Sequence, residues 1–479
     1  MRATNSYARG PHNPKGFQLT TIALAKTTGT TPAQTRTAQP RTTSGLGNTE
    51  IEVNTSKEPQ VNEGSKVTRA RAWRRQNVMY KITNSKALAG CHRWRRDEAV
   101  AVSWSSNGAS QFEGLQNSHS RWGSPLAELE VMGERRIELA IATKNHLAAG
   151  GALMMFVGTV RHNRSQSFAQ VEAGIKTAYS SMVKTSQWKK ERARYGVEHT
   201  YSDYEVTDSW ANGWHLHRNM LLFLDRPLSD DELKAFEDSM FSRWSAGVVK
   251  AGMDAPLREH GVKLDQVSTW GGDAAKMATY LAKGMSQELT GSATKTASKG
   301  SYTPFQMLDM LADQSDAGED MDAVLVARWR EYEVGSKNLR SSWSRGAKRA
   351  LGIDYIDADV RREMEEELYK LAGLEAPERV ESTRVAVALV KPDDWKLIQS
   401  DFAVRQYVLD CVDKAKDVAA AQRVANEVLA SLGVDSTPCM IVMDDVDLDA
   451  VLPTHGDATK RDLNAAVFAG NEQTILRTH

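Results

Sequence analysis

The feature that most constrains the fold is a pair of strand-like segments separated by a short polar turn. In HTYSDYEVT (199–207) every second side chain belongs to one face, as it does along a β-strand. The next residues, DSWANG (208–213), have the Asp, Ser, Asn and Gly composition of a tight turn. The apolar segment WHLHRNMLLFLD (214–225) then has the composition of a second strand that returns along the first. The sequence therefore predicts a β-hairpin here.

Further elements on both sides of the hairpin indicate an α+β fold. LMMFVGTV (153–160) is a continuous apolar run of strand length, which predicts a buried central strand. GVKLDQVS (261–268) is a second candidate strand. Helical patterns cover 134–150 and 167–196. A third helix is expected to begin at the capping box of Ser229 and Glu232 and to end near Gly252, and a fourth to run from Asp273 to Met285. This order predicts an antiparallel sheet with helices packed on one face.

Composition divides the rest of the chain. Residues 1–75 are rich in Thr, Ser, Asn, Gln, Gly and Pro, and they bury too little apolar surface to offset the entropy cost of ordering. We therefore expect a disordered basic N-terminal arm there. Residues 76–290 form the predicted α+β domain, residues 291–350 a linker and a helical segment, and residues 351–479 an acidic, mainly helical C-terminal domain.

Charge is balanced overall but unevenly distributed. The 61 Lys+Arg and 61 Asp+Glu cancel, so the whole molecule has no net attraction to nucleic acid. Residues 1–96 hold 17 Lys+Arg against 4 Asp+Glu, an excess of 13, and residues 351–479 hold 14 against 25, a deficit of 11. The Arg-rich segments TRARAWRRQ (68–76) and CHRWRR (91–96) are candidates for phosphate contacts, or for a solvated basic linker.

Cysteine usage and the amino terminus indicate a cytoplasmic protein. Cys91, Cys411 and Cys439 are too widely spaced for a disulfide framework. The amino terminus lacks the apolar stretch of a secretory signal, and no apolar run has the length of a membrane span. We therefore expect no membrane association.

The second strand of the predicted hairpin carries a candidate metal site. His215, His217 and Asn219 are spaced two residues apart, so they project from one face of the strand, roughly 6–7 Å from each other. Imidazoles select transition-type divalent ions, and oxygen ligands keep Mg²⁺ possible. Glu205, on the partner strand, is a candidate carboxylate ligand. Two histidines on a strand are also common without any metal, so this pattern alone leaves both interpretations open.

A second candidate group lies on the helix predicted after the last strand. Helical spacing places Lys276, Tyr280, Lys283 and Gln287 on one polar side. Neighbouring cations favour the phenolate of a tyrosine, whose reference pKa is about 10, and they offset charge on a phosphate. Tyr280 is therefore suited to attack a phosphodiester, although the same pattern also describes a packing tyrosine on an amphipathic helix.

Together these motifs resemble a known family. A His pair on a strand, a carboxylate on its hairpin partner and a downstream YxxK are similar to the HUH nucleases. The region from about 112 to 350 resembles the Rep initiators of rolling-circle plasmids of the Gram-positive and actinobacterial type. The matching segments are FVGTVRHN (156–163), YEVTDSWANGWHLHRNMLLFLD (204–225), TYLAKG (279–284) and WREYEVGSKNLRSSWSRGAKRALG (329–352).

The resemblance implies a ferredoxin- or RRM-like nuclease domain that acts as a metal-dependent endonuclease and strand transferase. Tyr280 would attack a phosphate of the plasmid origin, leaving a 5′-phosphotyrosine and a free 3′-OH, and would rejoin the strand at termination. Mn²⁺ or Mg²⁺ at the metal residues would polarise that phosphate, and Lys283 would steady the phosphate or the phenolate. Contacts with origin DNA are expected from Arg161, His162, Trp214 and Lys276, with Trp210 and Trp214 stacking on bases. The host would supply the polymerase and, since the chain has no G-x-x-x-x-G-K-[ST] loop, also the helicase.

Three departures from the family pattern bear on these expectations. Many relatives carry a third histidine where this chain has Asn219, so the metal pair is either His215 with His217 or His217 with Asn219. Relatives also carry a cysteine knuckle, but its positions here hold Ser118, Ser124 and Ala127, so we expect no structural zinc. Lys276 stands where some relatives have a glutamate proposed to act at termination, which leaves the termination mechanism open.

Other functions share these motifs. A single-tyrosine HUH transposase or a relaxase would use the same chemistry, but relaxases place the nucleophile ahead of the histidines, and Tyr280 follows them. A catalytically impaired origin-binding repressor is the alternative from a different class, given Asn219 and the absent cysteines.

Overall fold

The structure is a computed structural model that describes residues 63–105, 110–268, 300–371 and 384–443. Within these ranges the strands form two antiparallel sheets, one of six strands and one of four. The α+β class with antiparallel sheets is therefore confirmed.

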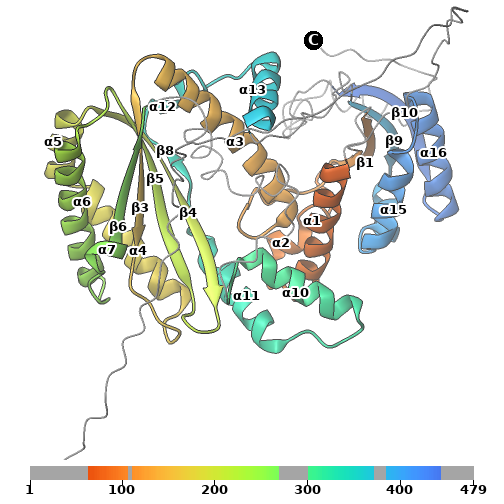
Figure 1. Ribbon diagram of the computed structural model, residues 1–479. Helices are drawn as coiled ribbons and strands as arrows, with labels where there is room; N and C mark the ends of the chain where they lie inside the picture. The colour runs from red at the N-terminus through yellow and green to blue at the C-terminus, as the bar shows by residue number, and fades with distance from the viewer. Residues whose placement is uncertain (1–62, 106–109, 269–299, 372–383, 444–479) are drawn as a thin grey trace, which may run out of the picture. The chain divides into compact units, whose positions relative to one another are not determined.

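The six-stranded sheet contains the predicted hairpin. Its order is β6-β3-β5-β4-β7, and β8 also pairs with β4 (Figure 1). The strands are β3 (Ala152–Thr159), β4 (Val197–Ser209), β5 (His215–Leu224), β6 (Val262–Val267), β7 (Ser301–Tyr302) and β8 (Ser342–Trp343). The antiparallel register of β4 and β5 pairs Glu205 with His217 and Asp203 with Asn219. The hairpin and the buried central strand β3 are thus confirmed.

One face of this sheet is covered by α4 (Phe168–Val183) and α6 (Asp230–Lys250) (Figure 1). Their apolar side chains share a core with Phe156, Met220 and Leu222 of the central strands. Helix α11 (Ala323–Ser336) joins this core through Trp329 and Tyr332. Helix α10 (Pro304–Asp316) and the short α7 (Arg258–Gly261) also belong to this part of the chain.

Two details of the predicted helices can be compared with the structure. The capping box of Ser229 and Glu232 at the start of α6 is confirmed, with both reciprocal hydrogen bonds present. The single helix predicted over 167–196 is wrong, because α4 is followed by a separate helix, α5 (Ser186–Arg194). Thr185 has extended backbone geometry and accepts a hydrogen bond from the Trp188 amide, so it caps a new helix instead of continuing the first.

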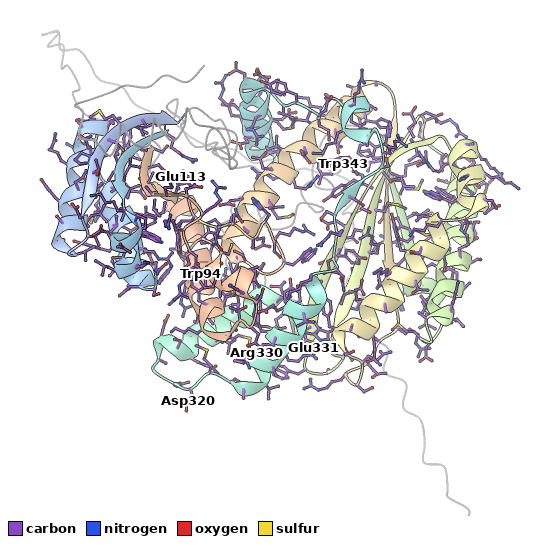
Figure 2. All side chains as sticks on the ribbon, turned by 180° about the vertical axis from the view of Figure 1, so that it is seen from behind. Trp94, Glu113, Asp320, Arg330, Glu331 and Trp343 are labelled. Carbon is purple, nitrogen blue, oxygen red and sulfur yellow. The ribbon has the colours of Figure 1, made fainter. Side chains whose placement is uncertain are left out.

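The other face of the sheet is also covered, which corrects the expectation of helices on one face only. Helix α3 (Pro125–Ala148), with α12 (Ala347–Ala350) and α13 (Ala358–Leu371), shares a core with Leu153, Met155 and Phe223. The physical reason is that β3 is apolar on both of its faces, so each face needs cover. Trp343 of β8, which is labelled in Figure 2, packs on Tyr201 with 4.8 Å between ring centroids. Its indole nitrogen donates a hydrogen bond of 3.3 Å to Glu138 of α3.

The four-stranded sheet joins segments from opposite ends of the described chain. Its order is β10 (Ser436–Met443), β9 (Arg384–Val390), β1 (Val100–Ser105) and β2 (Gln111–Glu113). Helices α14 (Pro392–Ile398), α15 (Phe402–Val412) and α16 (Val418–Ser431) pack on it through a separate apolar core. The described region after residue 351 is mainly helical, as expected, but it is not a separate helical domain, because its strand β9 pairs with β1 and β10 pairs with β9. No helix in the described ranges has the length and apolar composition needed to cross a bilayer.

The Arg-rich segment before residue 76 is helical in the structure. Helix α1 (Glu63–Ile82) precedes the short α2 (Lys86–Gly90), so the expected disordered arm does not extend to residue 75. Arg71 and Arg75 both donate to the carboxylate of Asp309 on α10, with their shortest contacts at 2.6 and 2.7 Å. Arg71 and Arg75 therefore link α1 to α10. The structure does not support a role for these two arginines in phosphate contacts.

We expect Asp309→Asn to destabilise the protein by about 1–3 kcal/mol at neutral pH, because two arginines lose a shared charged acceptor. Burial alone would raise the pKa of Asp309, but the hydrogen bonds from Arg75 and Arg71 outweigh it and hold the pKa below its ordinary value. This stabilisation is complete above the unfolded pKa of about 3.9 and is lost as the pH falls through the lower folded pKa.

Urea denaturation at neutral and acidic pH measures this effect. Asp313→Asn is the matched control, because Asp313 pairs with Arg74 but its side chain is 73% exposed, which predicts a loss below about 1 kcal/mol. Equal losses for the two variants would show that the Asp309 contact has no special role.

Candidate active site

The β4–β5 hairpin brings two histidines and a carboxylate together. His215 and His217 lie on the same face of β5, and Glu205 is the register partner of His217 on β4. The Nε2 atoms of the two imidazoles are in direct hydrogen-bond contact, and the ring centroids are 4.3 Å apart. The His217 Nδ1 atom lies 3.8 Å from the Glu205 carboxylate. The sequence prediction that these three side chains converge is therefore matched by their positions.

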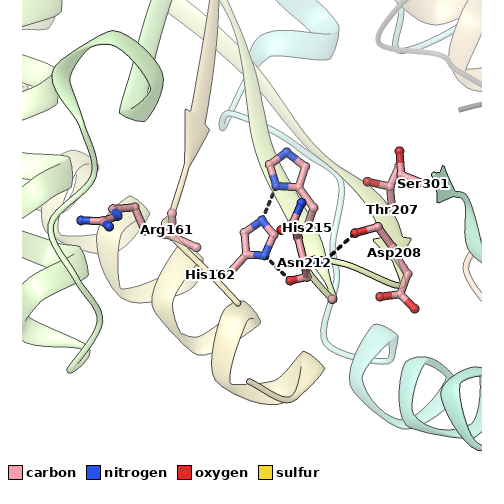
Figure 3. Close-up of a pocket in the computed structure, with 10 residues that line it drawn as sticks. Arg161, His162, Thr207, Asp208, Asn212, His215 and Ser301 are labelled. Carbon is pink, nitrogen blue, oxygen red and sulfur yellow. Dashed lines mark hydrogen bonds between the residues drawn. The ribbon is translucent and has the colours of Figure 1, made fainter. Parts of the chain in front are cut away.

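A third histidine joins the pair from the loop after β3. The Nε2 atom of His162 lies 2.6 Å from Nδ1 of His215, although the two residues are 53 positions apart (Figure 3). Sequence reasoning assigned His162 to DNA contact and missed this placement. The available signal was its position just after β3, the strand that pairs directly with β5.

The hydrogen bonds fix the tautomers of this row of imidazoles. The carbonyl of Asn212 can only accept, so the His162 Nδ1 atom 3.0 Å away carries the hydrogen and Nε2 carries the lone pair. His215 then donates from Nδ1 to His162 and accepts at Nε2 from His217. Burial lowers the pKa of His215 to about 3, with the nearby His217 and His162 adding to the shift. His215 is therefore neutral at physiological pH and keeps a lone pair for a ligand.

The donor set suits a divalent ion, but the side chains are in contact with each other. Within the described ranges, no group of three or more His, Cys, Asp or Glu side chains is arranged to hold a metal. Two imidazole nitrogens bound to one ion each lie about 2.1 Å from it, which separates them more than the direct contact of His215 and His217 allows. Metal binding therefore requires a rotation of at least one of these imidazoles.

Asn219 lies one step further along the same face of β5. It is 4% exposed, and its side-chain oxygen is buried without a hydrogen-bond partner among the described residues. Its register partner Asp203 accepts hydrogen bonds from Arg121, Tyr201 and Ser341.

A cavity of about 390 Å³ adjoins the histidines. Its lining includes His162, His215, Thr207, Asp208 and Ser301 (Figure 3). The carboxylate of Asp208 is 1% exposed, and it accepts two hydrogen bonds from Arg328 and one of 3.1 Å from the Tyr302 hydroxyl. Burial raises the pKa of Tyr302, and the adjacent Asp208 adds to the shift. The buried carboxylate of Asp208 in the cavity wall is therefore neutralised by Arg328 and hydrogen-bonded by Tyr302.

We expect Arg328→Ala to destabilise the protein by about 3–5 kcal/mol, because it leaves the Asp208 carboxylate buried without its cation. Thermal or urea denaturation measures the loss. Arg349→Ala is the control, since Arg349 is exposed, and it should change the free energy of unfolding by less than about 0.5 kcal/mol. If Arg328→Ala also changed the free energy of unfolding by less than about 0.5 kcal/mol, the Asp208 carboxylate would be exposed to water in solution.

The remaining predicted site residues fall into two groups. Tyr280, Lys283 and Lys276 lie outside the described residues. Arg161 is exposed, and its side chain extends away from the histidines in Figure 3.

The prediction that Trp214 contacts DNA is corrected. Its side chain is 0% exposed and packs on Phe168 and Tyr332, with Arg328 over its ring. Trp214 directly precedes His215, so it faces the opposite side of the sheet, toward the core under α4.

Two residues at the positions of the family's cysteine knuckle, Ser118 and Ser124, form hydrogen bonds with Cys91. Its thiol donates to the Ser124 hydroxyl at 3.4 Å and accepts from the Ser118 amide at 3.3 Å. The Ser124 hydroxyl also donates to Gln76 and accepts from the Ala127 amide at the start of α3. Hydrogen bonds thus connect this region. The expected lack of zinc stays a prediction that metal analysis of the purified protein can test.

Comparisons with known proteins agree with the motifs. A curated protein from Streptomyces lividans named Protein rep is 24% identical to this chain over 317 residues, which cover 54% of this chain and 69% of that protein. No family model matches the chain, and no solved structure matches it either. The similarity confirms the resemblance to Rep proteins.

Proposed function

We propose that this chain is a plasmid replication initiator that nicks one strand of a double-strand origin and rejoins it at termination. The observation that carries the proposal is the row of His162, His215 and His217 beside Glu205, next to a cavity, in a chain similar to a Rep protein. Imidazole and carboxylate donors suit a divalent ion such as Mn²⁺, and the oxygen donor also allows Mg²⁺.

In the proposed site His215 and His217 hold the ion, with Glu205 as a carboxylate ligand and His162 as a further imidazole. A divalent ion held by these residues would supply Lewis-acid polarisation of a non-bridging oxygen of the scissile phosphate. The Asn212 carbonyl fixes the His162 tautomer that keeps the Nε2 lone pair on the side of His215. Asn219 is the alternative ligand to His215.

Tyr280 supplies the nucleophile in this proposal. Its hydroxyl loses a proton to solvent, and the phenolic oxygen forms a bond to the phosphorus while the bond from phosphorus to the 3′ oxygen breaks. The 3′ oxygen takes up a proton, so the products are a 5′-phosphotyrosine and a free 3′-OH. Lys283 steadies the phosphate or the phenolate, and Lys276 and Arg161 contact the DNA backbone. Because one phosphodiester replaces another, the reverse reaction can close the strand without ATP.

The free 3′-OH is a primer for a host DNA polymerase, and a host helicase would unwind the duplex. The chain's own contribution is recognition of origin DNA and strand exchange at the phosphate.

Incubation of the purified chain with single-stranded oligonucleotides that tile the DNA flanking its own gene tests the proposal. With Mn²⁺ we expect cleavage at one position and a protein–DNA adduct that survives denaturing electrophoresis, and EDTA should abolish both. Specific binding without cleavage of any tile would contradict the nuclease and favour an origin-binding repressor.

A further inference from the structure

The turn between β4 and β5 presents an exposed tryptophan close to the histidines. Trp210 is 42% exposed. The Cζ atom of Arg164 lies over its ring at 5.3 Å from the centroid, and the same guanidinium donates to the Trp210 carbonyl. The ring of Tyr302 contacts the indole from β7, with 5.9 Å between centroids. The indole is therefore held in position while a large part of it faces solvent.

This turn is fastened to the loop that carries His162. Ser209 and Gly213 exchange backbone hydrogen bonds across the turn, and the Asn212 carbonyl accepts from His162. Gly213 has a φ of 73°, and a Cβ built there would lie 2.9 Å from the backbone of Arg164. Because the turn and the loop are so closely packed, Trp210 has a fixed position relative to the imidazoles.

The cavity next to the histidines is lined by Ser209 and Asn212, which belong to the same turn as Trp210. Its volume of about 390 Å³ is typical of small-ligand sites. Thr207 and Ser209, which both carry hydroxyl groups, are among the residues that line it. The charge of Asp208 is offset by Arg328 and by the Tyr302 hydroxyl, so this wall does not strongly repel a polyanion.

We propose that Trp210 is the stacking platform for one base of single-stranded DNA beside the scissile phosphate, with the base edge in the cavity near Thr207 and Ser209. The inference rests on the proposed function and adds the position of a nucleotide within the same site. Aromatic rings stack on any base, so this contact gives affinity with little sequence preference. Arg164 contributes by orienting the indole and by adding a cation near the backbone of the bound strand.

A comparison of two probes tests the stacking. The probes are a thymidine homopolymer and an abasic phosphodiester chain of equal length and charge, and binding of the full chain to each is measured by fluorescence anisotropy with Mn²⁺ present. We expect Trp210→Ala to bind the homopolymer on the order of 5- to 150-fold more weakly than the wild-type protein and to bind the abasic chain equally well. Trp210→Phe should retain most of the affinity, and Tyr355→Ala, at an aromatic that is 81% exposed elsewhere, should match the wild-type protein.

Equal losses on both probes, or a lowered melting temperature for Trp210→Ala, would show that Trp210 supports the fold and would overturn the inference. Unchanged affinity for the homopolymer would also overturn it. If the wild-type protein nicks DNA but binds the homopolymer no more tightly than the abasic chain, the stacking role of Trp210 is wrong and the proposed nuclease function still stands. If the protein prefers the homopolymer in a way that depends on Trp210 but cleaves no DNA, the proposed nuclease function is wrong and the stacking role still stands.

Discussion

Tyr280→Phe is expected to abolish strand cleavage and the covalent adduct while leaving DNA affinity within about twofold of the wild-type protein. Phenylalanine keeps the ring but lacks the oxygen that forms the bond to phosphorus, so no slower version of the same step remains. Binding depends on phosphate and base contacts that this substitution does not remove. Denaturing electrophoresis of a labelled oligonucleotide measures cleavage, and peptide mass mapping of the wild-type adduct identifies the attached tyrosine.

Tyr302→Phe is the matched control for that experiment. Tyr302 lies next to the cavity, but its hydroxyl donates to Asp208, and burial together with that carboxylate raises its pKa. A hydroxyl held in its protonated form is a poor nucleophile, so we expect Tyr302→Phe to cleave DNA at a rate close to that of the wild-type protein. Loss of cleavage in Tyr302→Phe with cleavage retained in Tyr280→Phe would exchange the roles of the two tyrosines.

Local patterns in the sequence were sufficient to predict the hairpin and its polar side chains. Alternation along 199–207 and 214–225 indicates which residues share a face, and the turn composition between them places Glu205 on the partner strand of His217. The register that pairs these two residues comes from the structure. The same alternation shows that Trp214 faces away from His215, so its assignment to DNA was an error that strand parity alone could have prevented.

Features that depend on tertiary contacts were not predictable in this way. His162 reaches His215 from a loop after β3, and only the order of strands in the sheet brings the two together. The pairing of β1 with β9 joins segments that are far apart in sequence, and no local pattern encodes such a partner. Residues 63–75 of helix α1 were assigned to a disordered arm from the composition of 1–75, and composition does not show that Asp309 of α10 pairs with Arg71 and Arg75.

His217→Ala is expected to lower the rate of Mn²⁺-dependent cleavage roughly 100- to 1,000-fold, because several kcal/mol of charge stabilisation at the phosphate is lost with the ligand. His217 is the member common to both candidate ligand pairs, so its loss affects the site under either assignment. We expect excess Mn²⁺ to restore part of the rate, since the remaining donors still bind the ion with lower affinity. Cleavage rates across a range of Mn²⁺ concentrations measure both effects.

Three further variants define which atoms hold the ion. His260→Ala is the control, because His260 is exposed and its side chain lies outside the imidazole row, and it should leave the rate unchanged. If His215 and His217 form the pair, His215→Ala should match His217→Ala and Asn219→Ala should retain most of the activity, whereas a His217/Asn219 pair predicts the reverse order. A His217→Ala protein that cleaves DNA at the wild-type rate in EDTA would show that the hairpin does not hold a catalytic metal, because cleavage would then need neither a divalent ion nor His217.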